Sequence, residues 1–106
     1  MIEYTEGIYK FHIYILTNKY RTTYYIGVTS NLKRRLQEHK ESIELRKKSF
    51  VARYNLTDLV YIETFGWIQQ ALAREKELKA WRREKKQNLI RCYNPKIEAL
   101  NSMFEK

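Results

Sequence analysis

Two stretches decide how this chain folds: His12-Ile13-Tyr14-Ile15-Leu16 and Tyr24-Tyr25-Ile26-Gly27-Val28. Both are rich in β-branched and aromatic residues, which is typical of strands. The polar residues 18–22 between them favour a hairpin loop. If the register pairs even with odd positions, Tyr14 and Tyr25 lie on the same face of the hairpin. Gly27, which shares this face with Tyr25, leaves room for a ligand or another backbone. The alternative explanation for the two tyrosines is that they occur there only because of their high β-propensity.

The rest of the chain alternates helical and strand patterns. An N-cap candidate precedes the first amphipathic run, and Gly66 separates a third apolar run from a long helical one. Residues 41–56 fit no single pattern. The expected elements are strands over residues 11–17, 23–28 and 58–65, a helix from Ser30 or Asn31 to about Lys40, and a long helix from Trp67 to about Lys86.

The composition indicates one globular domain with a strong excess of positive charge. The chain has 106 residues, of which 43% are hydrophobic and 31% charged, enough for one modest core. Its 21 Lys and Arg against 12 acidic residues give a formal net charge of +9. Because the basic residues cluster along the chain, nucleic acid is favoured over a merely solubilising surface. A membrane surface is disfavoured, since no basic amphipathic helix is free of core packing.

Further features predict a cytoplasmic protein. No run approaches the ~18 apolar residues of a membrane span, and residues 1–10 lack the apolar region of a secretory signal. Cys92 is the only cysteine, which fits a reducing compartment. This cysteine and two distant histidines, His12 and His39, do not make a zinc ligand set. Any metal is therefore expected to be hard and bound by oxygen.

The first predicted helix directs an arginine and a histidine toward the sheet. Leu32, Arg35, Leu36 and His39 follow one another at i, i+3, i+4 and i+7, so they share one face. If the leucines anchor this face, Arg35 and His39 point toward the protein. Arginine suits a phosphate because its planar fork donates two parallel hydrogen bonds. The alternatives are that Arg35 covers apolar surface with its stem and that His39 is structural.

Glu75 interrupts an apolar stripe on the long predicted helix. Ile68, Ala71, Leu72 and Leu78 form this stripe at helical spacing, and Glu75 lies in its middle. A carboxylate on a core-facing stripe is costly unless a cation or hydrogen bonds satisfy it. One explanation is an ion pair with a nearby lysine or arginine. The other is an oxygen ligand for Mg²⁺ or Mn²⁺.

The ordered combination of these residues resembles the GIY-YIG endonuclease family, whose two tyrosine triplets show the separation of eleven positions between Tyr14 and Tyr25. It continues through Arg35 and His39, Glu75 in Arg74-Glu75-Lys76, and Asn94 in Tyr93-Asn94-Pro95. The resemblance covers residues 11–95 of a single domain that spans 1–106. The chain looks like a small standalone member, similar to the nuclease module of the bacterial excision-repair incision protein. The implied fold is an α/β (α+β) domain with a three-stranded antiparallel sheet flanked by three to five helices.

A second candidate for the first triplet occurs nearer the N-terminus. Gly7-Ile8-Tyr9 has the family's letters but lies sixteen positions before Tyr25. The separation assigns the first triplet to His12-Ile13-Tyr14 instead. His12 then occupies the position where the family has glycine. This difference puts only the role of the glycine in question, since the chemistry is attributed to the tyrosine, here Tyr14.

The resemblance implies a divalent-metal-dependent endonuclease that hydrolyses phosphodiester bonds in DNA with little sequence specificity. Glu75 would hold one Mg²⁺ or Mn²⁺, and Arg35 would neutralise charge on the phosphoryl oxygens. Tyr14 would activate the water, a role that needs nearby cations to favour its phenolate. Tyr25 and His39 would orient the water or share the proton transfer, and the choice among these three as general base stays open.

The resemblance also gives Asn94 a site role, in positioning a neighbouring group or a substrate phosphate. The implied catalytic set is Tyr14, Tyr25, Arg35, His39, Glu75 and Asn94.

Basic side chains are expected to hold the nucleic acid through its phosphates, with weak sequence preference and steep salt dependence. DNA is favoured over RNA only by the resemblance, with DNA repair among the compatible settings. Two other classes remain open: a non-catalytic nucleic-acid-binding module of the same fold, and a module that binds an acidic protein. The expected phosphate contacts are Lys33, Arg34, Arg46, Lys47, Lys48, Arg53, Lys79, Arg82, Arg83, Lys85 and Lys86.

Overall fold

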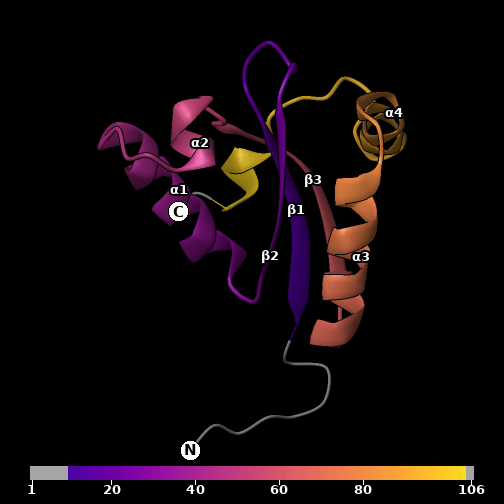
Figure 1. The fold of residues 1–106 in the computed structure, drawn as a ribbon. Helices are drawn as coiled ribbons and strands as arrows, with labels where there is room; N and C mark the ends of the chain where they lie inside the picture. The colour runs from indigo at the N-terminus through magenta and orange to yellow at the C-terminus, as the bar shows by residue number, and fades with distance from the viewer. Residues whose placement is uncertain (1–9, 105–106) are drawn as a thin grey trace, which may run out of the picture.

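The computed structural model describes residues 10–104, which form an α+β domain (Figure 1). The elements in chain order are β1 (Phe11–Thr17), β2 (Tyr24–Thr29), α1 (Leu32–Glu44), α2 (Phe50–Arg53), β3 (Asp58–Phe65), α3 (Ile68–Ala80), α4 (Arg83–Tyr93) and a 3₁₀ turn η1 (Asn101–Phe104). The strands form one antiparallel sheet in the order β2-β1-β3. Figure 1 shows α1 and α2 on one side of this sheet and α3 and α4 on the other. The expected three-stranded antiparallel sheet with flanking helices is confirmed.

The hairpin register places the two tyrosines on one face. β1 and β2 pair so that Tyr14 lies opposite Gly27 and Leu16 lies opposite Tyr25. Directly opposed residues share a face of a sheet, and so do alternate residues along a strand. Tyr14 and Tyr25 are therefore diagonal neighbours on the side of the sheet that α1 covers.

The sheet separates two hydrophobic layers. On one face, Ile13 of β1 packs with Leu78 of α3 in a buried cluster. On the other face, Tyr14 packs with Leu32 of α1 and Val51 of α2. Successive residues of β1 point to opposite faces, which is why this central strand is buried on both sides. The central strand that carries Tyr14 is therefore held in place by side-chain packing on both faces of the sheet.

The long helix predicted over residues 67–86 is two helices. α3 ends at Ala80, and α4 begins at Arg83 after extended backbone at Trp81 and Arg82. The side chain of Trp81 packs against the core, with the ammonium of Lys85 4.2 Å from its ring centre. The continuous helical pattern was misleading because both helices share its period. The helix is interrupted at Trp81, whose indole packs against the core.

The expected apolar stripe on α3 is also narrower than its spacing suggested. Ala71 and Leu78 are fully buried, whereas Leu72 is about half exposed. The buried face of α3 is therefore narrow, and Glu75 lies between its buried residues and the solvent-exposed side. Residues 41–56, which fit no single pattern, complete α1 and form the short α2.

The segment after α4 runs back along the outer edge of β3. The backbone N–H of Leu100 donates to the carbonyl of Leu59 at 2.7 Å. The N–H of Leu59 donates in turn to the side-chain oxygen of Asn101 at 2.9 Å. The amide of Asn101 also donates to the carbonyl of Thr57 at 2.9 Å. Both main-chain groups of Leu59 on this edge are therefore occupied.

Two further expectations concern the ends of the chain and the membrane. The triplet Gly7-Ile8-Tyr9 lies outside the described residues, so the assignment of the first triplet rests on the position of Tyr14 in β1. Within residues 10–104, no helix has the length and apolar character needed to cross a bilayer.

Candidate active site

Tyr14 is fully buried at the centre of the sheet, and its ring lies over Gly27 on the neighbouring strand. A Cβ atom on Gly27 would come within 2.5 Å of both Cζ and Oη of Tyr14. Gly27 was expected to leave room for a ligand or another backbone. The structure corrects this, because the phenol of Tyr14 fills the space. The missing side chain of Gly27 thus fixes where the Tyr14 hydroxyl lies.

The ring of Tyr14 is one of three aromatic rings that lie close together. The ring centres of Tyr14 and Tyr25 are 6.1 Å apart, and that of His39 lies 5.7 Å from Tyr14 and 5.5 Å from Tyr25. Tyr14 and Tyr25 come from adjacent strands, whereas His39 comes from α1. Tyr14, Tyr25 and His39 thus meet at one place. Of the four side chains expected in one pocket, the two phenols and the guanidinium of Arg35 lie together. Glu75, the fourth, lies on α3, which packs on the opposite face of the sheet.

A chain of hydrogen bonds links Tyr14 to α1. Its Oη lies 2.8 Å from Nε2 of His39, and Nε of Arg35 donates to the same oxygen at 3.3 Å. Arg35 also donates through Nη1 to a carboxylate oxygen of Glu38 at 2.9 Å. The sequence analysis missed Glu38, although its i+3 spacing from Arg35 on one helix could have revealed it.

The start of α1 sets the direction of these side chains. Asn31 caps the helix, its side-chain oxygen accepting from the N–H of Arg34 at 3.1 Å. Leu32 and His39 are buried on the inner face, and Arg35 lies half-buried between them. The helical spacing predicted this face. Leu32 anchors it, and Arg35 and His39 consequently reach Tyr14.

Burial decides the protonation of Tyr14. Burial raises the pKa of Tyr14 well above its ordinary value, and the neighbouring Tyr25 adds to this effect. The hydrogen bond and charge of Arg35 act in the opposite direction without overcoming the burial. Tyr14 is therefore a neutral phenol at neutral pH, and Arg35 by itself does not supply the stabilisation that a phenolate would need.

His39 is also neutral. Burial, with the positive charge of Arg35 as a second cause, lowers the pKa of His39 to about 4 against the opposing effect of Glu38. At neutral pH the imidazole has one N–H and one free lone pair. Since the guanidinium of Arg35 only donates, it occupies a lone pair of the Tyr14 oxygen. We assign the phenolic proton to the hydrogen bond with Nε2 of His39, which places the ring proton of His39 on Nδ1.

Arg35 keeps part of its guanidinium accessible. Hydrogen bonding to Glu38 raises the pKa of Arg35 above its ordinary value, so it stays charged. About 41% of its side chain is exposed, and its partner Glu38 is exposed to a similar extent. Solvent-exposed ion pairs contribute little, so a phosphate could replace Glu38 at small cost. Arg35 therefore combines a fixed contact to Tyr14 with a free side toward solvent.

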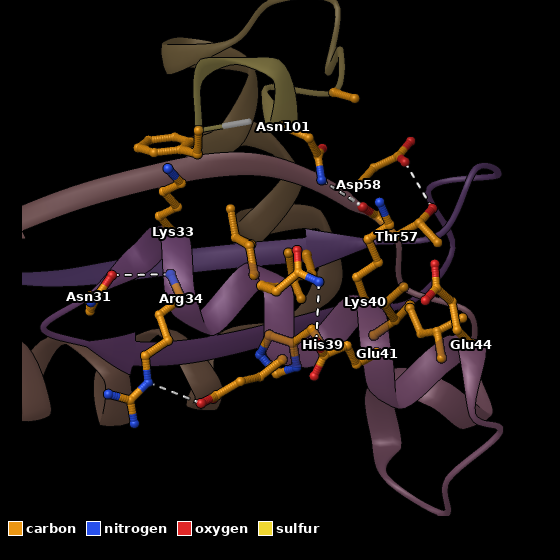
Figure 2. A pocket seen from close by; sticks show the side chains of 18 residues that line it. Asn31, Lys33, Arg34, His39, Lys40, Glu41, Glu44, Thr57, Asp58 and Asn101 are labelled. Atoms are coloured by element: carbon orange, nitrogen blue, oxygen red, sulfur yellow. Dashed lines mark hydrogen bonds and ion pairs between the residues drawn. The ribbon is translucent and has the colours of Figure 1, made fainter. Parts of the chain in front are cut away.

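A groove of about 1160 Å³ runs along the outer side of α1, bounded by the start of β3 and the C-terminal segment (Figure 2). His39 lines it from α1, and Asn101 lines it from the opposite wall. The wall carries charges of both signs: the carboxylates Glu38, Glu41, Glu44 and Asp58 and the cations Lys33, Arg34 and Lys40. Because the groove has no uniform positive charge, we do not place the substrate path there.

Glu75 lies on α3, whose buried residue Leu78 packs on the face of the sheet opposite Tyr14. Its carboxylate forms an ion pair with Lys79 at 3.1 Å, and its side chain is 21% exposed. This is the alternative pairing considered from the sequence, and no contact joins Glu75 to Tyr14 among the described residues. The role of Glu75 at a metal stays a prediction.

The residues were also tested for their fit to a divalent cation. Within the described part of the chain, no three His, Cys, Asp or Glu side chains cluster around a common point. Mg²⁺, however, is commonly held by one or two carboxylates together with water and substrate phosphates. Glu75 fits this mode, because Lys79, its one ion-pair partner within residues 10–104, is 56% exposed and can leave.

Asn94 is buried at the end of α4, where its amide contacts only main chain. It donates to the carbonyls of Val60 at 3.1 Å and Glu98 at 2.8 Å, and it accepts from the N–H of Glu98 at 3.1 Å. Both amide protons are thereby used. In the structure Asn94 fastens α4 to β3, and a role at a substrate phosphate stays a prediction.

His12 occupies the position where the family has glycine. Its Nδ1 lies 3.0 Å from the hydroxyl of Thr64, the residue opposite on β3. The side chain thus bonds across the sheet, and its pairing explains how a histidine is accommodated there.

The basic residues expected to contact phosphates lie on the surface. Ten of the eleven are exposed and Lys86 is half-buried. Arg34 and Lys79 are engaged with Glu38 and Glu75. The other exposed cations among these eleven residues form no ion pair within residues 10–104, so their charge is available to a polyanion.

The sheet contributes two tyrosines and α1 an arginine and a histidine, and all four side chains lie on one side of the sheet. The family model of the GIY-YIG catalytic domain matches residues 10–88, and the chain belongs to this family. No curated protein and no solved structure matches the chain. The family membership brings a nuclease-type function and nucleic acid as the class of partner.

Proposed function

We propose that this protein is a divalent-metal-dependent endonuclease that hydrolyses phosphodiester bonds in DNA with little sequence specificity. The observation that carries the proposal is the hydrogen bond of 2.8 Å between Tyr14 and the neutral imidazole of His39, with Arg35 beside it. A hydroxyl held between a proton acceptor and a guanidinium suits proton transfer next to a phosphate.

The proton relay follows from the protonation states. Tyr14 is fully buried, so the relay requires that substrate binding opens a path to its hydroxyl. A water attacking phosphorus then gives its proton to Oη of Tyr14, while Tyr14 passes its own proton to Nε2 of His39. The O–P bond to the water forms as the P–O bond to the departing oxygen breaks, and the departing oxygen takes up a proton from solvent. Because Tyr14 starts and ends as a neutral phenol, its raised pKa does not prevent this role. His39 becomes the imidazolium, a charge that burial and Arg35 oppose and that the carboxylate of Glu38 favours.

Arg35 binds the phosphoryl group. Its guanidinium is already held by Tyr14, so its remaining donors are directed without further ordering. Tyr25 closes the site on the side of β2 and helps to orient the water. Glu75 would hold one Mg²⁺ or Mn²⁺, which would supply Lewis-acid chemistry when bound. Because α3 packs on the sheet face opposite Tyr14, the relay through Tyr14 and His39 is not routed through this ion.

The substrate is held mainly through its backbone. The exposed cations listed above contact phosphates without reading bases, which supports weak sequence preference and steep salt dependence. DNA is proposed over RNA on the family's endonuclease character. A reducing, cytoplasmic setting is proposed from the single cysteine, Cys92, with DNA repair among the compatible processes.

The proposal is tested by nicking of supercoiled plasmid with Mg²⁺, with Mn²⁺ and with EDTA. Wild type is expected to nick only with metal. Tyr14→Phe keeps the ring but loses the hydroxyl and is expected to lower the rate at least ~100-fold. Tyr20→Phe, on an exposed tyrosine outside the site, is the matched control and should keep the wild-type rate.

The second candidate function is a non-catalytic nucleic-acid-binding module. The observation in its favour is the ion pair of Glu75 with Lys79, which occupies the expected metal ligand. Under this alternative, wild type and Tyr14→Phe bind DNA equally and neither nicks it. Metal-dependent nicking that survives in Tyr14→Phe would instead contradict the relay while leaving the enzyme class in place.

A further inference from the structure

Two exposed aromatic rings lie beside the candidate site on α2. Phe50 and Tyr54 are each 45% exposed, and their ring centres are 4.8 Å apart. The ring centre of Phe50 lies 6.3 Å from that of Tyr25. A continuous line of aromatic rings therefore runs from the site out to the surface. Core packing does not account for the exposed end of this line.

The segment that carries the two rings is firmly held. Ser49 caps α2 by accepting from the N–H of Ala52 at 3.1 Å, and its hydroxyl lies 2.8 Å from that of Ser42 on α1. Val51 and Leu56 are almost fully buried beneath the turn. The rings are thus presented by an anchored element, which limits the entropy lost when a ligand stacks on them.

Positive charge adjoins the rings along the chain. Arg53 lies on α2 between Phe50 and Tyr54, and a basic loop precedes the helix. All of these cations are exposed, and none forms an ion pair with another described residue. The loop contributes Arg46, Lys47 and Lys48.

We propose that Phe50 and Tyr54 form a base-stacking platform, and that the preferred substrate carries an unpaired nucleotide beside the scissile phosphate. Flat rings next to free cations are the combination that binds single-stranded nucleic acid, because bases stack on the rings while the cations track the backbone. The inference rests on the proposed function, since it names the substrate class of the same site.

The preference for an unpaired base follows from what a duplex exposes. In a paired helix both faces of a base are covered by its neighbours, so a ring has nothing to stack on. Pulling a base out costs about as much as one stacking contact returns. A base that is already unpaired, in a flap, a gap or a single strand, avoids that cost. The platform therefore favours such DNA over an intact duplex.

The first test measures binding in EDTA, so that it does not depend on cleavage. Three DNAs share one sequence: a duplex, a single strand and a duplex with a single-stranded flap, each with 2-aminopurine at the same position. Wild type is expected to bind the flap and the single strand at least tenfold more tightly than the duplex. It should also quench 2-aminopurine only where that base is unpaired, since stacking quenches this base.

Leucine substitutions remove the flat rings while keeping apolar bulk. Phe50→Leu and Tyr54→Leu, singly, should each lose the quenching and weaken flap binding about tenfold, with duplex affinity within twofold of wild type. Tyr20→Leu replaces an exposed tyrosine outside the platform and should change nothing. Thermal melting confirms that each variant is folded, and Tyr54→Leu alone suffices if Phe50→Leu does not fold.

Two results would overturn the platform. One is equal affinity of wild type for flap and duplex. The other is a loss of affinity in the leucine variants that is the same for all three DNAs, which would indicate a structural role or a protein partner for the rings. Failure of the nuclease proposal looks different: flap preference and quenching persist in EDTA, but no metal restores cleavage.

Discussion

The phenol of Tyr14 occupies the space that a side chain at position 27 would need. Cζ and Oη of Tyr14 would both lie 2.5 Å from a Cβ atom on Gly27. The two residues face each other across β1 and β2, so the contact follows directly from the register of the hairpin. The glycine of the second triplet thus positions the tyrosine of the first.

Gly27→Ala is expected to displace Tyr14 and break its hydrogen bond to His39. Overpacking of this kind typically costs 1–3 kcal/mol, and we expect about 2 kcal/mol with a loss of nicking of at least ~10-fold. Urea denaturation and plasmid nicking measure the two effects. Gly66→Ala is the matched control, because a Cβ atom there meets nothing within 4 Å. A Gly27→Ala protein that nicks at the wild-type rate would show that the position of Tyr14 is not critical.

His39 predicts a pH dependence of stability with a defined sign. Its pKa falls to about 4 in the folded protein from the ordinary value of 6.5, so the unfolded chain binds more protons between these values. Stability from this residue is therefore complete above pH ~6.5 and is lost as the pH falls toward 4. The full effect is on the order of 3 kcal/mol.

His39→Gln removes the titrating group and should flatten this part of the curve. Urea denaturation from pH 4 to pH 7.5 gives the free energy of unfolding of both proteins, and other acidic groups cancel in their difference. A difference between the two proteins that does not vary with pH would contradict the neutral, buried state of His39.

Glu75 is expected to matter for metal-dependent nicking and little for stability. Glu75→Gln removes the charge at nearly constant shape, and Lys79 is exposed, so the lost ion pair costs at most ~1 kcal/mol. Nicking with Mg²⁺ should fall at least ~100-fold, since several kcal/mol of charge stabilisation are at stake. Glu77→Gln, on the same helix and also ion-paired, should keep its activity. Equal activity of the two variants would exclude Glu75 as the metal ligand.

Asn94 is expected to act on stability first. Asn94→Ala leaves the carbonyl of Val60 without this partner in a buried setting and removes two contacts to Glu98. We expect a loss of roughly 2–4 kcal/mol in urea denaturation. Asn88→Ala on the exposed side of α4 is the control. If Asn94→Ala abolishes nicking at a temperature where it is fully folded, Asn94 contributes to the site directly.

The sheet and the Tyr14 side of the site were predictable because short-range periodicity determines them. Alternation along two strands set Tyr14 and Tyr25 on one face, and i, i+3 and i+7 spacing aimed Arg35 and His39 at them. These relationships depend only on the alternation of residues in a hairpin and on the periodicity of a helix, and both can be recognised in the sequence.

The features that were missed depend on tertiary packing. The break at Trp81 does not interrupt the helical period, so only the docking of the indole on the core reveals it. Burial of Tyr14 outweighs the charge of Arg35, and a sequence does not show which effect is larger. The contacts of Asn94 join segments far apart in the chain, which local patterns do not report.

The segment that follows α4 has a consequence for how copies of this protein behave in solution. β3 is an outer strand of the sheet, and unpaired outer strands invite pairing with other chains and aggregation. Leu100 and Asn101 occupy the N–H and carbonyl of Leu59 that would otherwise face solvent. The C-terminal segment thus covers the outer edge of β3 at Leu59. A protein shortened before Leu100 would be prone to self-association along this edge.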